Sequence, residues 1–282
     1  MPDFYCPNFN PIILTFGPIS LYWYGAMYVI SFIFAKYYLK YYRCSFDKIT
    51  WVKEDIENLL CLSFLGMLIG GRIGYVVLYQ WSYFIKDLLW VFKIWEGGMS
   101  FHGGLVGVII SIMYFSYHKN YSFLKVSDFV VPVVPVGLGL GRLGNFINGE
   151  LWGRVTNMPW AMLFNHAASQ DLLISQSDPN WQLLFDYYGA LPRHPSQLYE
   201  MFLEGIILFI IINLFIRKLR PTGSISSIFL IFYGLFRILS ECFRQPDSQI
   251  GLINDIFTLG QILSFPMILV GIIIMYFIYK YN

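Results

Sequence analysis

The chain has 282 residues, of which 57% are hydrophobic, 20% aromatic and only 13% charged. Soluble domains carry about 25% charged residues, so this composition argues against a soluble protein. The net charge of +2 is too small to indicate a nucleic-acid partner, and no basic run is suited to a phosphate backbone. The four cysteines lack C-x-x-C spacing, and no metal site is expected.

Long windows without Asp, Glu, Lys or Arg predict membrane-spanning helices, because such a helix needs about 20 mostly apolar residues. We therefore expect an all-α polytopic membrane protein, with residues 1–282 forming a single membrane domain of about seven transmembrane helices. No cleavable signal peptide is recognised, so the first apolar window is expected to remain as a helix. The expected spans lie near residues 18–40, 57–80, 98–117, 127–147, 196–216, 223–243 and 258–280.

Lysine and arginine indicate the orientation, since they concentrate in cytoplasmic loops. They cluster after the first, third and fifth spans and at the C-terminus. This pattern predicts an outside N-terminus and a cytoplasmic C-terminus. The long connection at 148–195 is then a small extracytoplasmic head. Residues 81–98 carry three tryptophans and are expected to form an interfacial arm.

Three arginines interrupt the apolar stretches: Arg72, Arg142 and Arg237. Each costs roughly 2.5–3.5 kcal/mol at a helix centre, so each needs an anion, a ring of carbonyls or water. Arg237 can pair with Glu241 one helical turn later, and Glu200 and Glu204 share the same i,i+4 spacing. Arg72 has no acid nearby and is expected to serve a structural role or to extend outwards.

Arg142 lies among closely spaced glycines and is followed by Asn145 and Asn148. Glycines allow another group to approach the backbone, and guanidinium binds phosphate bidentately. This arrangement suits a phosphate better than a protein carboxylate. Helix packing is the alternative, but it explains the glycines and not the charge.

His102 lies between glycines at the outer end of the third span. It could be a hydrogen-bonded packing residue, or a proton acceptor near the outer surface. The sequence has no H-E-x-x-H or G-x-S-x-G motif, so it matches neither a zinc protease nor an α/β-hydrolase. The residues alone predict an outward-facing cationic pocket for an anionic amphiphile, most simply a phospholipid headgroup.

Five ordered blocks closely resemble the prolipoprotein diacylglyceryl transferase family. The most specific is GRLGNFINGELWGRVT at 141–156. Its companions are LYWYG at 21–25, MSFHGGLVG at 99–107, RHPSQLYE at 193–200 and YGLFRILSECFRQPD at 233–247. Together these blocks extend over most of the chain.

The resemblance implies an integral inner-membrane transferase. This family moves the diacylglyceryl group of phosphatidylglycerol to the lipobox cysteine of prolipoprotein signal peptides, forming a thioether and releasing glycerol phosphate. No metal or organic cofactor is implied, and membrane lipids are the remaining partners. By position, the resemblance assigns catalysis to His102, Arg142 and Arg237, and lipid binding to these two arginines, Asn145 and Tyr24. Supporting roles fall on Glu150, Gly153, Glu241 and Asn148.

The chemistry leaves open which group removes the proton of the incoming thiol. Fixed cations at the departing phosphate lower the barrier, but the incoming thiol, with a pKa near ~8.5, must also lose its proton. Either His102 is the base, or the arginine field lowers the thiol pKa. Other classes also remain: a phospholipid transporter or flippase with an intramembrane cationic headgroup site, or a non-catalytic scaffold. The absence of an internal repeat and the odd number of spans argue against a transporter.

Overall fold

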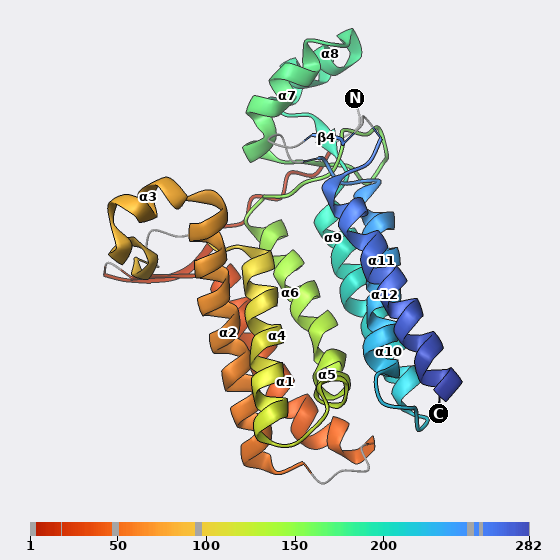
Figure 1. The fold of residues 1–282 in the computed structure, drawn as a ribbon. Helices are drawn as coiled ribbons and strands as arrows, with labels where there is room; N and C mark the ends of the chain where they lie inside the picture. The colour runs from red at the N-terminus through yellow and green to blue at the C-terminus, as the bar shows by residue number, and fades with distance from the viewer. Residues whose placement is uncertain are drawn as a thin grey trace. The chain divides into compact units, whose positions relative to one another are not determined.

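The computed structural model describes residues 4–17, 19–46, 51–93, 98–246, 251–253 and 256–281, and this part of the chain is mostly helical (Figure 1). It divides into two compact units. One comprises Phe34–Val130, and the other comprises Met1–Ile33 with Val131–Asn282.

The unit Phe34–Val130 is built around two helices that lie side by side, α2 and α4 (Figure 1). The short helix α3 lies at one end of this pair, in the segment expected to form the arm. Residues 94–97 of that expected arm lie outside the described residues. The elements of the unit Phe34–Val130 are the end of α1 (Trp23–Tyr37), η1 (Tyr38–Tyr42), η2 (Arg43–Phe46), α2 (Lys53–Tyr79), α3 (Trp81–Lys86), η3 (Leu88–Phe92), α4 (Phe101–His118) and α5 (Phe123–Val130).

Glycines bring α2 and α4 into backbone contact. Gly66, Gly70 and Gly74 recur at every fourth position of α2 and meet Gly103 and Gly107 of α4. A Cβ atom on Gly70 would lie 2.4 Å from the Gly103 carbonyl oxygen, and one on Gly103 would lie 2.3 Å from that of Gly70. Small residues at such spacing let membrane helices approach closely. The glycines beside His102 therefore serve helix packing.

Replacing Gly70 by alanine is expected to destabilise this pair by about 1–3 kcal/mol, because the methyl group forces two backbones apart. Thermal unfolding in detergent measures the effect. Gly137→Ala is the matched control, since its nearest neighbouring atom, Ser31 Oγ, lies 4.0 Å from the added Cβ. An equal loss of stability in both variants would contradict the packing role of Gly70.

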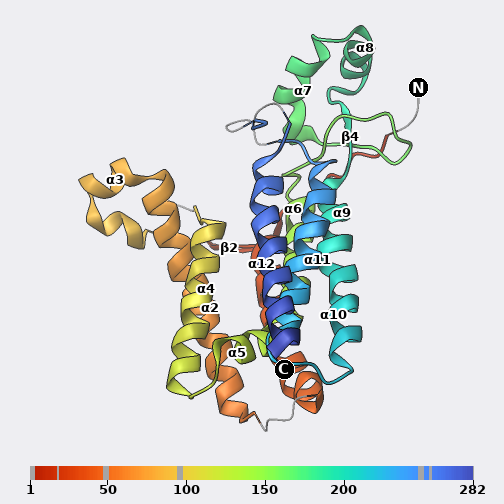
Figure 2. The same ribbon diagram turned by 45° about the vertical axis from the view of Figure 1, so that its right-hand side comes forward.

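The second unit contains the remaining helices and two small antiparallel sheets, β1–β2 and β3–β4. Figure 2 shows α11 and α12 side by side, with α9 and α10 continuing one another through a π-helical turn. Its elements are β1 (Ile12–Phe16), β2 (Ile19–Tyr22), the start of α1, η5 (Val131–Val133), α6 (Val134–Ile147), β3 (Met162–Leu163), η6 (Asn165–Ala167), α7 (Ala168–Ser175), α8 (Pro179–Tyr188), β4 (Pro192–Arg193), α9 (Ser196–Glu200), η7 (Met201–Ile207), α10 (Leu208–Ile216), α11 (Ser224–Glu241) and α12 (Leu259–Tyr281).

The segment expected as a head, 148–195, contains α7 and α8, joined to the strands β3 and β4 (Figure 1). Local signals explain α8. The Asp178 side chain accepts a hydrogen bond from the Asn180 N–H at 2.8 Å, and Pro179 occupies the first helical position. Gly189 then ends the helix in the left-handed conformation, with φ of 72°.

The expected helix at 18–40 begins later than predicted. Residues 12–16 and 19–22 instead pair as the strands β1 and β2, with Phe16 opposite Ile19. β-branched residues in β1 favour an extended chain, and Gly17 adopts a φ of 58° at the turn. The helix α1 consequently starts at Trp23.

Among the described residues, five helices are long and apolar enough to cross a membrane. They are Lys53–Val77, Phe123–Ile147, Ser196–Ile216, Ser224–Glu241 and Leu259–Tyr281. The expected spans at 18–40 and 98–117 are not among these five. Helix α1 has only 15 residues, fewer than the roughly 20 that a bilayer requires. Helix α4 has 18 residues, but histidines, glycines and serines reduce its mean hydropathy.

Candidate functional site

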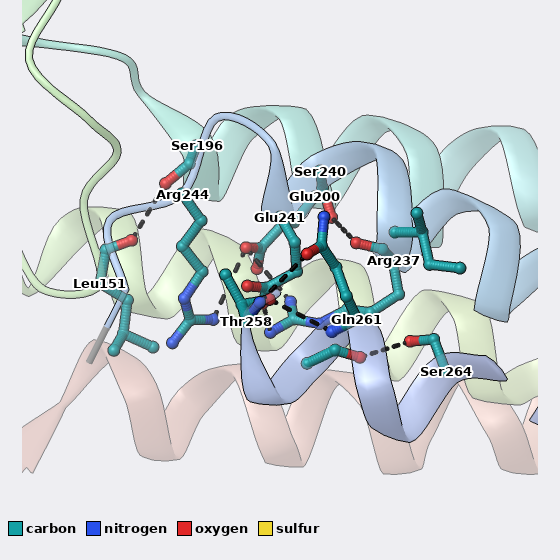
Figure 3. Close-up of polar contacts among 12 residues, drawn as sticks. Leu151, Ser196, Glu200, Arg237, Ser240, Glu241, Arg244, Thr258, Gln261 and Ser264 are labelled. Atoms are coloured by element: carbon teal, nitrogen blue, oxygen red, sulfur yellow. Dashed lines mark hydrogen bonds and ion pairs between the residues drawn. The ribbon is translucent and has the colours of Figure 1, made fainter. Parts of the chain in front are cut away.

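Three arginines and three glutamates meet between helices of the second unit. Figure 3 shows Glu200, Arg237, Glu241 and Arg244 among them. Arg142 comes from α6 and Arg237 from α11, while Arg244 follows the end of α11. The carboxylates are those of Glu200, Glu204 and Glu241. We call these six residues the arginine–glutamate cluster.

Glu200 is the most highly connected member of the cluster. Its Oε2 lies 2.5 Å from Arg142 Nε, and its Oε1 lies 3.2 Å from Arg237 Nη1 and 3.6 Å from Arg244 Nη1. Glu204 lies 3.7 Å from Arg142 Nη2 and 3.6 Å from Arg237 Nη1. The Ser240 hydroxyl also donates to Glu204 Oε1 at 3.3 Å. One carboxylate thus links three guanidinium groups.

Helical spacing and close helix packing produce this arrangement. Glu200 and Glu204 lie four residues apart and face the same side, although a π-helical turn begins between them. Gly139 of α6 and Gly205 of η7 pack so closely that a Cβ on Gly205 would lie 2.8 Å from Gly139 Cα. This close approach brings Arg142 within reach of both glutamates.

Burial differs between the two kinds of charge. The three carboxylate side chains are at most 5% exposed, whereas those of Arg142 and Arg237 are 17% and 14% exposed. The glutamates therefore lie in the interior and offset the cost of holding arginines among apolar helices. Part of each of these two arginine side chains remains exposed.

Two sequence-based expectations about these arginines are decided here. The predicted i,i+4 pair is confirmed, because Arg237 Nη2 contacts Glu241 Oε1. For Arg142 the sequence favoured a phosphate over a protein carboxylate, and the structure supplies two carboxylate partners, Glu200 and Glu204. Those carboxylates come from a helix about sixty residues away in the chain. They balance the charge of Arg142, while helix packing accounts for the neighbouring glycines.

The loop after α6 is held by its own side chains. The Asn145 amide donates to Glu150 Oε1 at 2.8 Å, and the Asn148 amide donates to the same oxygen at 3.4 Å. The Glu150 carboxylate thus accepts a hydrogen bond from both amide groups. The Gln197 side chain binds the Glu150 carbonyl at 2.7 Å and ties this loop to α9.

Position 153 has no room for a side chain, and Tyr24 packs against a different glycine. A Cβ on Gly153 would lie 2.5 Å from the His194 carbonyl oxygen and 2.6 Å from that of Phe243. The Gly153 N–H donates to the same His194 carbonyl at 2.9 Å. Tyr24 of α1 packs on Gly144 of α6, and its hydroxyl accepts a hydrogen bond from Tyr28 at 3.4 Å.

His102 and Arg72 belong to the other compact unit, Phe34–Val130. His102 is exposed in the first turn of α4, with its ring 5.7 Å from that of Phe101. Arg72 is 4% exposed and donates to the carbonyls of Val91, Lys93 and Gly98 at 2.8–3.3 Å. Arg72 therefore does not extend outwards. It is satisfied by a set of carbonyls, one of the three options expected for it.

Comparison with known proteins identifies the family. A family model described as "Prolipoprotein diacylglyceryl transferase" matches residues 11–277. The chain belongs to the prolipoprotein diacylglyceryl transferase family. Its arginine–glutamate cluster and the Asn145–Gly153 loop fall within the matched residues, as do His102 and Tyr24.

Three relatives are named phosphatidylglycerol–prolipoprotein diacylglyceryl transferase. One from Blochmanniella floridana is 68% identical over the whole of both chains. One from Sodalis glossinidius (strain morsitans) is 56% identical over 97% of this chain and 94% of its own. One from Pectobacterium carotovorum subsp. carotovorum (strain PC1) is 54% identical over 97% of this chain and 95% of its own.

Within this family member, Arg193 links the head to the loops around the cluster. Its side chain is fully buried and donates to Asp171 Oδ1 at 2.8 Å, to the Gly153 carbonyl at 2.9 Å and to Gln245 Oε1 at 3.3 Å. The other Asp171 oxygen accepts from the Leu191 N–H at 2.9 Å. One side chain thus joins α7, the loop after α6 and the segment after α11.

Sequence reasoning did not assign a role to Arg193 or Arg244, and it did not place Glu200 and Glu204 with Arg142. A signal existed for both glutamates, because their i,i+4 spacing put two acids on one face of an apolar helix. For Arg193, the signal was its place at the start of the RHPSQLYE block. No group of His, Cys, Asp or Glu suited to a metal ion occurs among the described residues.

Proposed function

We propose that the chain transfers the diacylglyceryl group of phosphatidylglycerol to the thiol of the lipobox cysteine in prolipoprotein signal peptides. The thiol sulfur bonds to a glycerol carbon, the carbon–oxygen bond to phosphate breaks, and glycerol phosphate leaves. The observation that carries this proposal is the pair of partly exposed arginine side chains, Arg142 and Arg237, in apolar helices of a chain that is similar throughout its length to transferases of that name.

Arg142 and Arg237 are assigned to the lipid phosphate. Both arginine side chains are partly exposed, and the glutamates hold their guanidinium groups in place. As the carbon–oxygen bond breaks, negative charge grows on the departing oxygen and fixed cations stabilise it. Asn145 and Tyr24 complete the lipid site in this assignment. Glu150, Gly153, Asn148 and Glu241 orient the arginines and the loop after α6.

His102 is proposed as the base that takes the thiol proton, with the arginine field as its rival. If the histidine is the base, His102→Asn and His102→Gln are expected to lose about 10²–10⁴-fold in kcat, the usual contribution of a general base. Transfer rates between pH 6 and 8 measure this, because a thiol near pKa ~8.5 ionises further over that range. Near-normal turnover of both variants across these pH values would eliminate the base assignment.

The proposed topology has seven spans. In this proposal the helical stretch α1–η1 and the helix α4, which packs along α2, are the two further spans. Basic residues then place the N-terminus outside and the C-terminus in the cytoplasm of a bacterial inner membrane. Residues 1–282 form one membrane domain, with an extracytoplasmic head at 148–195 and an interfacial arm at 81–98.

A phospholipid transporter or flippase is the competing function, since it too needs a cationic headgroup site. The relatives' names favour the transferase. The decisive experiment incubates purified protein with phosphatidylglycerol and a synthetic lipobox peptide. Mass spectrometry should find the diacylglyceryl mass on the peptide cysteine, and a peptide with serine at that position should stay unmodified. Movement of lipid between leaflets without a covalent product would favour the flippase.

A further inference from the structure

The first turn of α12 contacts the arginine–glutamate cluster through a residue with no side chain. A Cβ on Gly260 would lie 2.5 Å from Glu241 Oε1, 2.7 Å from its Cδ and 3.1 Å from its Cγ. All three of these nearest atoms belong to Glu241. The space that a side chain at position 260 would fill is therefore occupied by this carboxylate.

The start of α12 is itself held firmly beside the cluster (Figure 3). The Thr258 N–H donates to Gln261 Oε1 at 3.1 Å, and the Gln261 N–H donates to Thr258 Oγ1 at 3.2 Å. This reciprocal pair is a capping box, which fixes the residue at which a helix begins. The Ser264 hydroxyl also donates to the Gly260 carbonyl at 2.7 Å. Gly260 is thus presented to Glu241 in a defined position, and the positive end of the helix favours a carboxylate there.

Glu241 connects this helix start to the cluster. Its Oε1, the atom nearest to Gly260, also contacts Arg237 Nη2. The carboxylate is 5% exposed and lies between the arginine and the backbone of α12. Any group added at position 260 must push this oxygen away from the guanidinium.

We propose that Gly260 is a positioning residue for the transfer reaction, acting by admitting the Glu241 carboxylate that orients Arg237 toward the lipid phosphate. This inference rests on the proposed function. It makes α12 a part of the lipid-binding machinery, although none of the residues expected to bind lipid lies on that helix.

The test is Gly260→Ala in the full-length protein, assayed with phosphatidylglycerol and the lipobox peptide. The atoms nearest to the methyl group belong to the flexible side chain of Glu241, so the helix can stay in place while Glu241 moves. KM for the lipid is expected to rise about tenfold, the effect of losing one charge-assisted contact. KM for the peptide should not change.

Gly271→Ala is the matched control on the same helix. A Cβ there would lie 2.8 Å from Ile231 Cγ1 and 2.9 Å from the Ser227 carbonyl oxygen. The control therefore disturbs the same α11–α12 interface at least as strongly, without reaching the cluster. A merely structural role for Gly260 predicts similar kinetics for the two variants, and that result would overturn the proposal.

A double-mutant cycle tests whether Gly260 acts through Glu241. In a Glu241→Ala background the carboxylate is gone, so adding Gly260→Ala should leave the lipid KM unchanged. A further tenfold rise there, or an unchanged lipid KM in the single Gly260→Ala variant, would contradict positioning through Glu241. Absence of any transferred mass with the wild-type protein would instead reject the proposed function itself.

Discussion

Replacing Arg142 by lysine is expected to lower kcat/KM for lipid transfer about a hundredfold, which corresponds to roughly 3 kcal/mol of transition-state stabilisation. A lysine ammonium is a point donor on a flexible stem and cannot reproduce a planar fork. In this structure the Arg142 fork spans Glu200 and Glu204. A single ammonium group could not keep both contacts and also bind phosphate.

Initial rates at several phosphatidylglycerol concentrations separate the lipid KM from kcat. Arg220→Lys serves as the control, because Arg220 is exposed and its guanidinium packs over the Phe215 ring at 4.3 Å. Full activity of Arg142→Lys at an unchanged lipid KM would argue against bidentate recognition of the phosphate.

Replacing Arg193 by methionine is expected to reduce the unfolding free energy by about 3–5 kcal/mol, because one half of a buried ion pair remains without its partner. Both side chains of the Arg193–Asp171 pair are fully buried, and Arg193 Nη2 lies 2.6 Å from Asp171 Oδ1. Loss of the Gly153 and Gln245 contacts should also loosen the segments beside the cluster. Thermal unfolding and limited proteolysis of the purified protein report both effects.

The pH dependence of this variant has a definite sign. Burial raises the pKa of the Asp171 carboxyl, while the Leu191 N–H and Arg193 oppose that rise. Without Arg193, the Asp171 carboxyl of the folded protein binds a proton more readily than that of the unfolded chain. The loss of unfolding free energy caused by Arg193→Met should therefore shrink as the pH falls from 7 to 5. The exposed Lys93–Asp87 pair is the control. Lys93→Met should cost much less stability than Arg193→Met, because an exposed ion pair contributes little, and an equal cost for both variants would contradict the importance of burial.

Much of the fold can be predicted from the sequence, because a helix that spans a bilayer needs a long stretch without charged residues. The expected span at 196–216 corresponds to the apolar stretch Ser196–Ile216, and that at 258–280 to Leu259–Tyr281. The hairpin β1–β2 was missed because a run of apolar residues without charge is compatible with either helix or strand. The start of α1 was consequently placed several residues too early.

The site was only partly predictable for a different reason. Arg237 and Glu241 lie on one helix, so their spacing alone reveals the contact. Arg142 and Glu200 come from separate helices, and no single-sequence pattern indicates which helices pack together. The same holds for Arg72, whose carbonyl partners belong to an irregular segment. Contacts within one element follow from periodicity, whereas contacts between elements follow from packing.

The glycine contact between α2 and α4 has a consequence for motion. Where these glycines meet, backbone atoms form the contact and no side-chain rotamer can change, so the two helices have little freedom to slide or separate. Any movement of α2 and α4 is therefore expected to carry both helices together, with the bending confined to the connections at their ends.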